Sequence, residues 1–593
     1  MRSLNSANGF IDFYKPLVIE YYSEYNFKFK NTSDYRDFSD FTNHINEQAY
    51  QLSILPYSKD YLYKLVDNGH VFLFQITSKD FSPYSKGRPN LHTIYWKMLF
   101  DDKNLSDVVY KLNGKAEMFF RKKSITKPVI HCANQEIENK SAYNKQHKAF
   151  SKFEYDIIKD RRFTRNQYEF HVPITMNFKP TGSGHFNQDV LTFIKEKGIK
   201  HIIGIDRGER HLLYLTMINM KGEIVEQFSL NSVASNPNNP DYKQDYNELL
   251  STKESDRQSA RRNWSAIENI KELKAGYLSQ IVHLLSKMMI ENDAILVLEN
   301  LNTGFMRGRQ KVEKSVYQKF EKMLIDKLNY VVDKTAANNE PCGALKALQL
   351  TDTYENFNKR KGNVRQCGFV FYIPAWNTSK TDPVTGFVNL FDMRLSTIGE
   401  IKAFFSKFDH IKYNANKDSF EFSFDYNNFT SRAEGTRSCW TISSQGERIF
   451  THRSKEQNNQ FVSEKVYPTQ LFKEVFSNAG FDINGNLKEG IASIDSLELL
   501  KQLLHAFKLL MQMRNSITGT DVDYLLSPAI DADGSSFDSR KGDKTLPVNA
   551  DANGAFNIAR KGLMLVDQIQ ATDDVTSIKF DVSNKEWLKF VQQ

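Results

Sequence analysis

Two apolar segments that each end on an acidic residue restrict the folds open to this chain more than any other feature. The run 202–205 ends on Asp206, and the run 294–298 ends on Glu299. Short, continuous apolar runs of this kind are typical of strands buried on both faces of a sheet. A lone acid after a strand is most often a turn residue, but two buried strands with the same ending are harder to explain in that way.

The elements around these runs predict how the two strands meet. Residues 212–218 and 224–230 are strand-like and follow tight turns, so three antiparallel strands should open the sheet. Apolar residues then recur at three- and four-residue steps from Trp264 to Met288, which predicts a long amphipathic helix. A strand after such a crossover should lie parallel to and beside an earlier one, with Asp206 and Glu299 facing each other. This is the strand order of an RNase H-like sheet.

A third acidic residue, Asp551, begins a helix predicted over 551–562, where a carboxylate suits the helix dipole. Packed across the strand ends, it would complete a cluster with Asp206 and Glu299. Three carboxylates held close together resist joint ionisation unless a cation binds, and oxygen ligands suit Mg²⁺ or Mn²⁺. The cluster predicts a divalent-metal centre able to hydrolyse a phosphodiester with two ions.

The rest of the chain is predicted to form further domains, because 593 residues exceed a single core. Strand-like runs at 71–76 and 168–177, separated by basic loops, predict a β-rich module that ends near Lys179. A helix over 316–332 and an inserted domain over 375–549 should follow. With no apolar signal core, no bilayer-length apolar run and no C-x-x-C pair, the chain is expected to be cytoplasmic with free thiols.

The formal net charge of +8 is gathered into basic patches. They lie at 121–123, 159–162, 261–262 and 307–311, and they suit a polyanionic partner. A solvated surface is the commoner explanation for any one of these patches.

The segments around the three acids resemble a known family. The stretches 203–210 (IGIDRGER), 297–302 (VLENLN) and 550–555 (ADANGA) are similar to the three split RuvC motifs of the type V-A CRISPR effector nucleases, and 85–93 (SKGRPNLHT) and 153–156 (FEYD) resemble further signatures. The resemblance implies a guide-RNA-directed DNA endonuclease whose single RuvC centre cuts both strands. It implies Mg²⁺ or Mn²⁺ as cofactor, and a CRISPR guide RNA and double-stranded target DNA as partners.

The same resemblance implies a multidomain α+β fold, with a β-rich, oligonucleotide-binding-like wedge ahead of a split RuvC domain. The implied parts are residues 1–25 for the remnant of a PAM-interacting region, 26–178 for the C-terminal portion of the wedge, 179–255 for RuvC-I, 256–272 for the bridge helix, 273–374 for RuvC-II, 375–549 for the Nuc domain and 550–593 for RuvC-III.

Further residues enter through the resemblance. Arg514 matches an arginine implicated in target-strand cutting, where it could neutralise a phosphate, and Asp523 lies in the same loop. His131, Lys140 and Lys159 match the residues with which the family processes its precursor RNA without a metal ion. By pattern alone Arg514 is an ordinary surface arginine, and His131 is either a phosphate contact or a histidine with no functional role. The nucleic-acid-binding candidates are Lys86, Arg88, His92, Arg121, Arg261, Arg262, Trp264, Arg307 and Arg309.

The chain differs from the family in its extent. The recognition lobe that holds the guide–target duplex, and most of the PAM-reading segment, are expected to be missing. Asn549 also stands where the family often has an acidic residue. Three hypotheses follow: a nuclease half completed by an N-terminal partner chain, a module that binds or trims the RNA handle without cutting DNA, and an inactive fragment.

Overall fold

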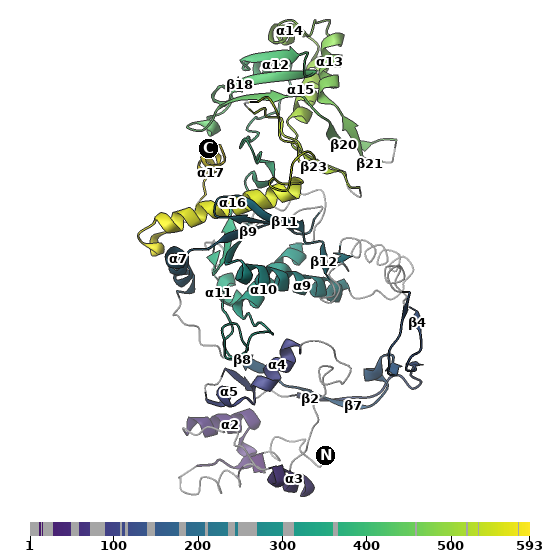
Figure 1. Cartoon of the computed structure of the whole chain (residues 1–593), viewed down its shortest axis with the longest axis vertical. Coiled ribbons are helices and arrows are strands. Elements are labelled where there is room, and N and C mark those ends of the chain that lie inside the picture. Colours follow the sequence, from purple (N-terminus) through teal and green to yellow (C-terminus); the bar gives the residue numbers. More distant parts are fainter. Residues whose placement is uncertain are drawn as a thin grey trace. The chain divides into compact units, whose positions relative to one another are not determined.

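The computed structural model divides the chain into two compact units (Figure 1). The smaller unit comprises Met1–Lys179 and Asp333–Lys346, and the larger unit comprises Pro180–Val332 and Ala347–Gln593. None of the described helices is long and apolar enough to cross a membrane. The structure describes residues 11–12, 15, 28–48, 59–70, 89–106, 109–112, 117–138, 149–176, 185–207, 211–234, 243–246, 270–300, 314–359, 366–456, 459–517, 520–531, 533–578, 580 and 582–592.

The larger unit is built on a six-stranded mixed sheet with the strand order β11-β10-β9-β14-β16-β15. Strands β9, β10 and β11 are antiparallel neighbours, and β14 lies parallel to both β9 and β16. The predicted hairpin order and the predicted parallel pairing are therefore confirmed. The strands are β9 (His201–Asp206), β10 (Tyr214–Asn219), β11 (Ile224–Ser229), β14 (Ala294–Glu299), β15 (Gln366–Cys367) and β16 (Val370–Ile373), with a separate pair formed by β12 (Ser232–Ala234) and β13 (Lys243–Asp245).

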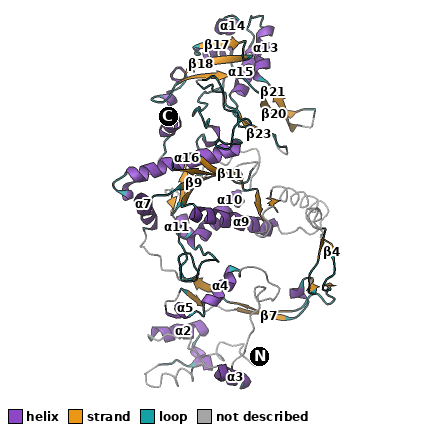
Figure 2. Cartoon of the chain, in the orientation of Figure 1, coloured by secondary structure: helices purple, strands orange, loops and turns teal. Residues whose placement is uncertain are grey.

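Helices cover both faces of this sheet, as Figure 2 shows, because its central strands are apolar on both faces. Ile203 and Leu296 belong to the core shared with α9 and α10, whereas Ile202 and Ile295 belong to the core shared with α7, α16 and α17. Successive strand residues point to opposite faces, so a continuous apolar run is needed where both are covered. The helices are α7 (Phe186–Lys197), α9 (Ile270–Glu291), α10 (Lys314–Asn329), α11 (Tyr354–Lys359), α16 (Ala550–Ala571), η8 (Val575–Ser577) and α17 (Asn584–Val591).

The helix α16 is fixed both at its start and along its length. Asn549 caps it by accepting a hydrogen bond from the amide of Ala552 at 2.8 Å. Asparagine caps helices as well as aspartate does, so the start of the helix does not need the acidic residue that the resemblance leads one to expect. Further along, α16 packs directly on β9 at Gly204, where a Cβ atom would lie 2.2 Å from the carbonyl oxygen of Ala555 and 2.6 Å from the amide nitrogen of Ala559.

The segment between β16 and α16 has an apolar core of its own within the larger unit. Phe404, Phe408, Phe422 and Phe507 pack edge to face in it, with ring centroids of contacting pairs 5.3–5.7 Å apart. This core fits the predicted insertion, although the boundaries 375–549 stay a prediction. The elements are η5 (Thr378–Lys380), α12 (Ile398–Ser406), β17 (His410–Asn414), β18 (Ser419–Asp425), η6 (Tyr426–Asn428), η7 (Ser431–Ala433), β19 (Cys439–Ser443), β20 (Arg448–Ser454), β21 (Gln460–Val466), α13 (Pro468–Asn478), α14 (Leu487–Ser493), α15 (Leu497–Leu510), β22 (Arg514–Ser516) and β23 (Asp523–Leu525).

The smaller unit combines helices with strands that pair two by two: β1 with β8, β2 with β7, β3 with β6 and β4 with β5. The single strand predicted over 168–177 is wrong, because β7 ends at His171 and β8 begins at Ile174. Pro173 between them lacks the amide hydrogen that a continuous ladder needs. The oligonucleotide-binding-like wedge stays a prediction. The elements are η1 (Thr32–Asp34), α2 (Phe38–Glu47), α3 (Lys59–Asp67), α4 (Leu91–Met98), α5 (Asp102–Ser106), β1 (Tyr110–Leu112), β2 (Glu117–Arg121), β3 (Ile130–His131), β4 (Ile137–Glu138), β5 (Phe150–Ser151), β6 (Ile157–Ile158), η3 (Arg161–Phe163), β7 (Gln167–His171) and β8 (Ile174–Met176).

Candidate metal centre

Asp206 and Glu299 lie side by side where two central strands of the main sheet end. This row of strand ends is here called the sheet edge. They are the last residues of β9 and β14, and the parallel register that pairs Ile205 with Leu298 brings the two acids next to each other. Both are buried, with exposed fractions of 6% and 7%. The edge therefore holds two buried carboxylates, as the strand order predicts.

Asp551 reaches the same edge from the first turn of α16 and is fully buried. The helix comes this close because Gly554 has no side chain: a Cβ atom there would lie 2.4 Å from Oδ2 of Asp206. The charges of both Glu299 and Asp551 act on Asp206. Asp206 is thus within electrostatic range of both of the other predicted carboxylates.

The inserted segment contributes a cation to this cluster. Arg514, the first residue of β22, donates from its guanidinium to Oδ1 of Asp551 at 2.5 Å. The backbone amide of His211 donates to Oδ2 of the same carboxylate at 3.3 Å. The Arg514 side chain is 31% exposed, whereas that of Asp551 is 0% exposed. The Arg514 side chain is therefore partly accessible to solvent while it pairs with a fully buried carboxylate.

A second group of possible ligands surrounds Asp551. Ligand atoms of His211, Asp523 and Asp551 all lie within 4.8 Å of one another, and Nε2 of His211 is 3.8 Å from Oδ2 of Asp523. Nδ1 of His211 lies 2.8 Å from the hydroxyl of Ser229, which orients the ring. This group differs from the three predicted carboxylates and shares Asp551 with them.

Burial and mutual repulsion oppose ionisation at the sheet edge. Burial, followed by the charges of Glu299 and Asp551, raises the pKa of Asp206 well above its usual value. Burial also raises the pKa of Glu299, although a hydrogen bond from Thr378 acts in the opposite direction. A divalent cation would relieve the repulsion and replace the lost hydration. Buried carboxylate oxygens are the ligands that Mg²⁺ and Mn²⁺ prefer, so these residues fit such an ion.

Groups from three other segments surround Glu299. The hydroxyl of Thr378 donates to Oε1, and the guanidinium of Arg207 donates to the backbone carbonyl. Lys561 of α16 is buried nearby, and burial lowers the pKa of its ammonium to about 7, opposed by the charge of Glu299. The hydrogen bond from Thr378 therefore fixes one oxygen of the carboxylate, while Arg207 fixes the backbone of the same residue.

The predicted RNA-processing residues lie in the smaller unit. Strands β3 and β6 pair His131 with Ile157, and the amide of Lys159 donates to the carbonyl of Val129 at 2.9 Å. This antiparallel register puts His131 and Lys159 on one face of the strand pair, at diagonal positions. Lys140 lies outside the described residues.

Two of the nucleic-acid-binding candidates can be placed. His92 is exposed in the first turn of α4, and the guanidinium of Arg121 lies 5.6 Å from the ring centroid of Phe163. The following predictions fall outside the described residues: the strand at 71–76, residues 256–269 of the bridge helix, and Lys86, Arg88, Arg261, Arg262, Trp264, Arg307 and Arg309.

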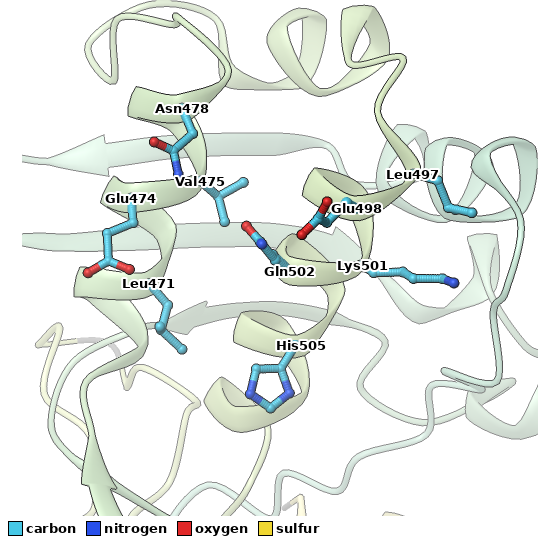
Figure 3. A pocket seen from close by; sticks show the side chains of 9 residues that line it. All are labelled: Leu471, Glu474, Val475, Asn478, Leu497, Glu498, Lys501, Gln502 and His505. Atoms are coloured by element: carbon cyan, nitrogen blue, oxygen red, sulfur yellow. The ribbon is translucent and has the colours of Figure 1, made fainter.

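A separate pocket lies between α13 and α15 in the inserted segment (Figure 3). Glu474, Glu498, Lys501 and His505 are among the residues that line it. Its lining contains none of the predicted site residues, so the pocket is not part of the candidate centre.

His211 and Thr378 are contacts that the sequence pattern did not predict. His211 directly follows the motif 203–210 that contains Asp206, and this nearness is the one signal that could have singled it out. Thr378 lies 79 positions from Glu299, and no periodicity or motif marks it. Only the packing of α16 and η5 against the sheet brings it to the site.

In this part of the chain, the ends of two adjacent strands of a mixed sheet and the first turn of a following helix together carry buried carboxylates. This arrangement defines a nuclease domain of the RuvC type. A family model of the RuvC nuclease domain matches residues 180–593, more than half of the chain. A second model, described as the CRISPR-associated endonuclease Cpf1 PI domain, matches residues 2–50. The chain belongs to the RuvC nuclease family, and within it to the Cpf1-like CRISPR-associated endonucleases of type V-A. RuvC nucleases use divalent metal ions.

Proposed function

We propose that this chain hydrolyses DNA phosphodiester bonds with divalent metal ions held by Asp206, Glu299 and Asp551, under the direction of a guide RNA. The observation that carries the proposal is the burial of the three carboxylates, with the charges of Glu299 and Asp551 both acting on Asp206. Bound Mg²⁺ or Mn²⁺ would activate water and stabilise the leaving oxygen. A single centre of this kind would cut both strands in turn.

Neighbouring residues have proposed roles of their own. Arg514 is partly exposed and already contacts a carboxylate oxygen, so it is suited to bind the scissile phosphate when a metal ion occupies Asp551. Asp523 and His211 would supply further ligands beside Asp551. The charge of Arg514 would then stabilise the negative charge that develops on the phosphate.

The proposed partners are a CRISPR guide RNA and double-stranded target DNA. The candidate basic residues of the predicted wedge (26–178), of the bridge helix (256–272) and of RuvC-II (273–374) would contact their phosphates, which makes binding salt-dependent. A recognition lobe, whichever chain supplies it, is proposed as the element that holds the guide–target duplex.

Cleavage of a labelled DNA duplex tests the proposed function. The chain is combined with a guide RNA and a separately expressed recognition portion of the family, and a guide of unrelated sequence is the control. Cutting should require Mg²⁺ or Mn²⁺, stop in EDTA, and return when excess Mg²⁺ is added. No cutting by two well-folded parts in the presence of metal would refute the proposal and favour an inactive fragment.

A second activity, trimming of the precursor guide RNA, is proposed for the smaller unit. The observation that favours it is the shared face of His131 and Lys159 on the β3–β6 pair. The RNA 2′-hydroxyl would attack the adjacent phosphate and break its bond to the 5′-oxygen of the next nucleotide, leaving a 2′,3′-cyclic phosphate and a 5′-hydroxyl. His131 would transfer a proton in this step, and Lys159, with Lys140, would stabilise the developing charge. This chemistry needs no metal ion.

Trimming is therefore expected to persist in EDTA and to fall about 10²-fold or more in His131→Ala, the usual loss for a general acid or base. Gel analysis of a labelled precursor measures both effects. His410→Ala, which alters an exposed histidine on β17, is the matched control. Trimming that disappears in EDTA, or that survives in His131→Ala, would assign the reaction to other residues.

A further inference from the structure

The helix α16 presents a row of buried polar side chains to one short segment of the chain. Asn553, Asn557 and Lys561 are spaced by about one helical turn, so they lie on one face of the helix. Their exposed fractions are 0%, 0% and 1%. A buried amide or ammonium is costly unless it is hydrogen-bonded, so the partners of this row indicate what the row holds.

Each member of the row donates to main-chain carbonyls of residues 374–381, the segment that leaves β16 for the inserted domain, and Asn557 also donates to Oδ1 of Asn553 at 3.2 Å. The donors and their acceptor carbonyls are Asn553 to Thr381 (2.9 Å), Asn557 to Thr378 (2.9 Å) and Asn557 to Thr381 (3.3 Å), with Lys561 donating to both Pro374 and Trp376 (2.8 Å each). Where a segment leaves a sheet, its carbonyls no longer accept hydrogen bonds from a neighbouring strand. The side chains of the row on α16 donate to these carbonyls instead, and they thereby fix the path of the segment.

This held segment carries the hydroxyl that reaches Glu299. Thr378 opens the short helix η5 and is itself 3% exposed. Its carbonyl is held by Asn557, while its hydroxyl donates to Oε1 of Glu299. A continuous path of buried hydrogen bonds therefore runs from α16 through Thr378 to the carboxylate at the end of β14.

We propose that Thr378 is a positioning residue for the metal-binding carboxylate of Glu299, and that Asn553, Asn557 and Lys561 hold it in place. The helix that supplies Asp551 would thereby also orient Glu299, so two ligands from distant parts of the chain are aligned by one rigid element. The inference rests on the proposed function, because it assigns Glu299 to a metal ion. Partners that orient a ligand in this way typically contribute 10–100-fold to metal affinity.

The direct test measures the binding of Mn²⁺ to the full chain by electron paramagnetic resonance. In Thr378→Val, which keeps the shape of the side chain and removes the hydroxyl, the Mn²⁺ dissociation constant is expected to rise about 10–100-fold. Thr378→Ser restores the hydroxyl and should bind within about twofold of the unaltered chain, about 0.4 kcal/mol at most. Thr351→Val removes another buried hydroxyl of the larger unit, one that donates to the carbonyl of Ile325 at 3.0 Å, and should also leave binding unchanged.

The row on α16 is tested by combining substitutions. Asn557→Ala should weaken Mn²⁺ binding by itself, but it should add little in a chain that already carries Thr378→Val, because both act through one hydrogen bond to Glu299. The effects of the two substitutions on the free energy of unfolding are measured in the same variants. These effects can add fully even where the effects on Mn²⁺ binding do not. Independent losses of Mn²⁺ affinity in the double variant would overturn the role of the row.

The outcomes separate this inference from the proposed function. If the unaltered chain binds Mn²⁺ and Thr378→Val binds it equally well, the positioning role is overturned and the proposed function stands. If the unaltered chain binds no Mn²⁺ at all, both are overturned. Equal weakening in Thr378→Val and Thr351→Val would show that loss of a buried hydroxyl acts only through general destabilisation, which also overturns the inference.

Discussion

Replacing Asp206 with asparagine is expected to lower metal-dependent DNA cleavage about 10³-fold or more, since Lewis-acid assistance by a bound ion is worth several kcal/mol. Asparagine keeps the shape of the side chain and removes the charge that holds the ion. Glu299→Gln should have a similar effect, because the two acids end neighbouring parallel strands. Single-turnover cleavage in saturating Mg²⁺ measures the loss, and RNA trimming by the same variants should be unchanged.

The same substitution should affect stability in the opposite direction when no metal is bound. The pKa of Asp206 is raised in the folded chain, so the folded state keeps a proton that the unfolded chain loses near pH 4. The stability contributed by this proton is complete below about pH 4 and is lost as the pH rises through the folded-state pKa. The asparagine in Asp206→Asn does not ionise, so the variant carries no buried charge at this position at any pH. In EDTA its stability relative to the unaltered chain should therefore rise as the pH increases above about 4, as measured by urea unfolding.

Asp495→Asn is the matched control for both measurements, because this carboxylate is 95% exposed and pairs with Lys402 at the surface. It should leave cleavage and the pH dependence of unfolding unchanged. Mg²⁺ should stabilise the unaltered chain and the control against urea, but stabilise Asp206→Asn much less. Cleavage that survives in both Asp206→Asn and Glu299→Gln would show that the carboxylate assignment is wrong.

Replacing Gly204 with alanine is expected to destabilise the larger unit by about 3 kcal/mol, at the upper end of the cost of overpacking a core. The added Cβ atom would lie 2.2 Å from a backbone oxygen and 2.6 Å from a backbone nitrogen of α16, and neither can rotate away. The helix would have to move off β9 and take Asp551 with it. Misplacement of a ligand by about 1 Å can cost about 10² in rate, so cleavage should fall as well.

Gly276→Ala provides the opposite result in the same protein. Gly276 lies within α9, and a Cβ atom there would meet nothing within 4 Å. Alanine is favoured over glycine inside a helix by about 0.8–1.0 kcal/mol, so this variant should be slightly more stable and fully active. Urea unfolding of both variants distinguishes the two effects. A Gly204→Ala chain as stable as the unaltered one would show that α16 does not pack on β9 as described.

The sheet and two of its acids could be predicted because their signals are local. The buried runs that end on Asp206 and Glu299, and the turns between the hairpin strands, are short-range patterns, and the crossover rule relates the strands without side-chain detail. Errors arose where local patterns compete: Pro173 splits one predicted strand into β7 and β8. Arg514 and Asp523 entered through family motifs, since their own surroundings in the sequence resemble an ordinary surface loop.

The sequence by itself determined which strands carry an acid at their ends, because a period of two residues and a buried apolar run are properties of neighbouring positions. Only the tertiary structure decided which side chains surround those acids and Asp551 of α16. His211 reaches Asp551 across 340 positions, Arg514 across 37, and Thr378 reaches Glu299 across 79. Such contacts depend on the distance at which a helix packs on a sheet, here at Gly204 and Gly554, and this distance must be correct to within a fraction of an ångström. That distance is set by packing, and no local pattern of residues encodes it.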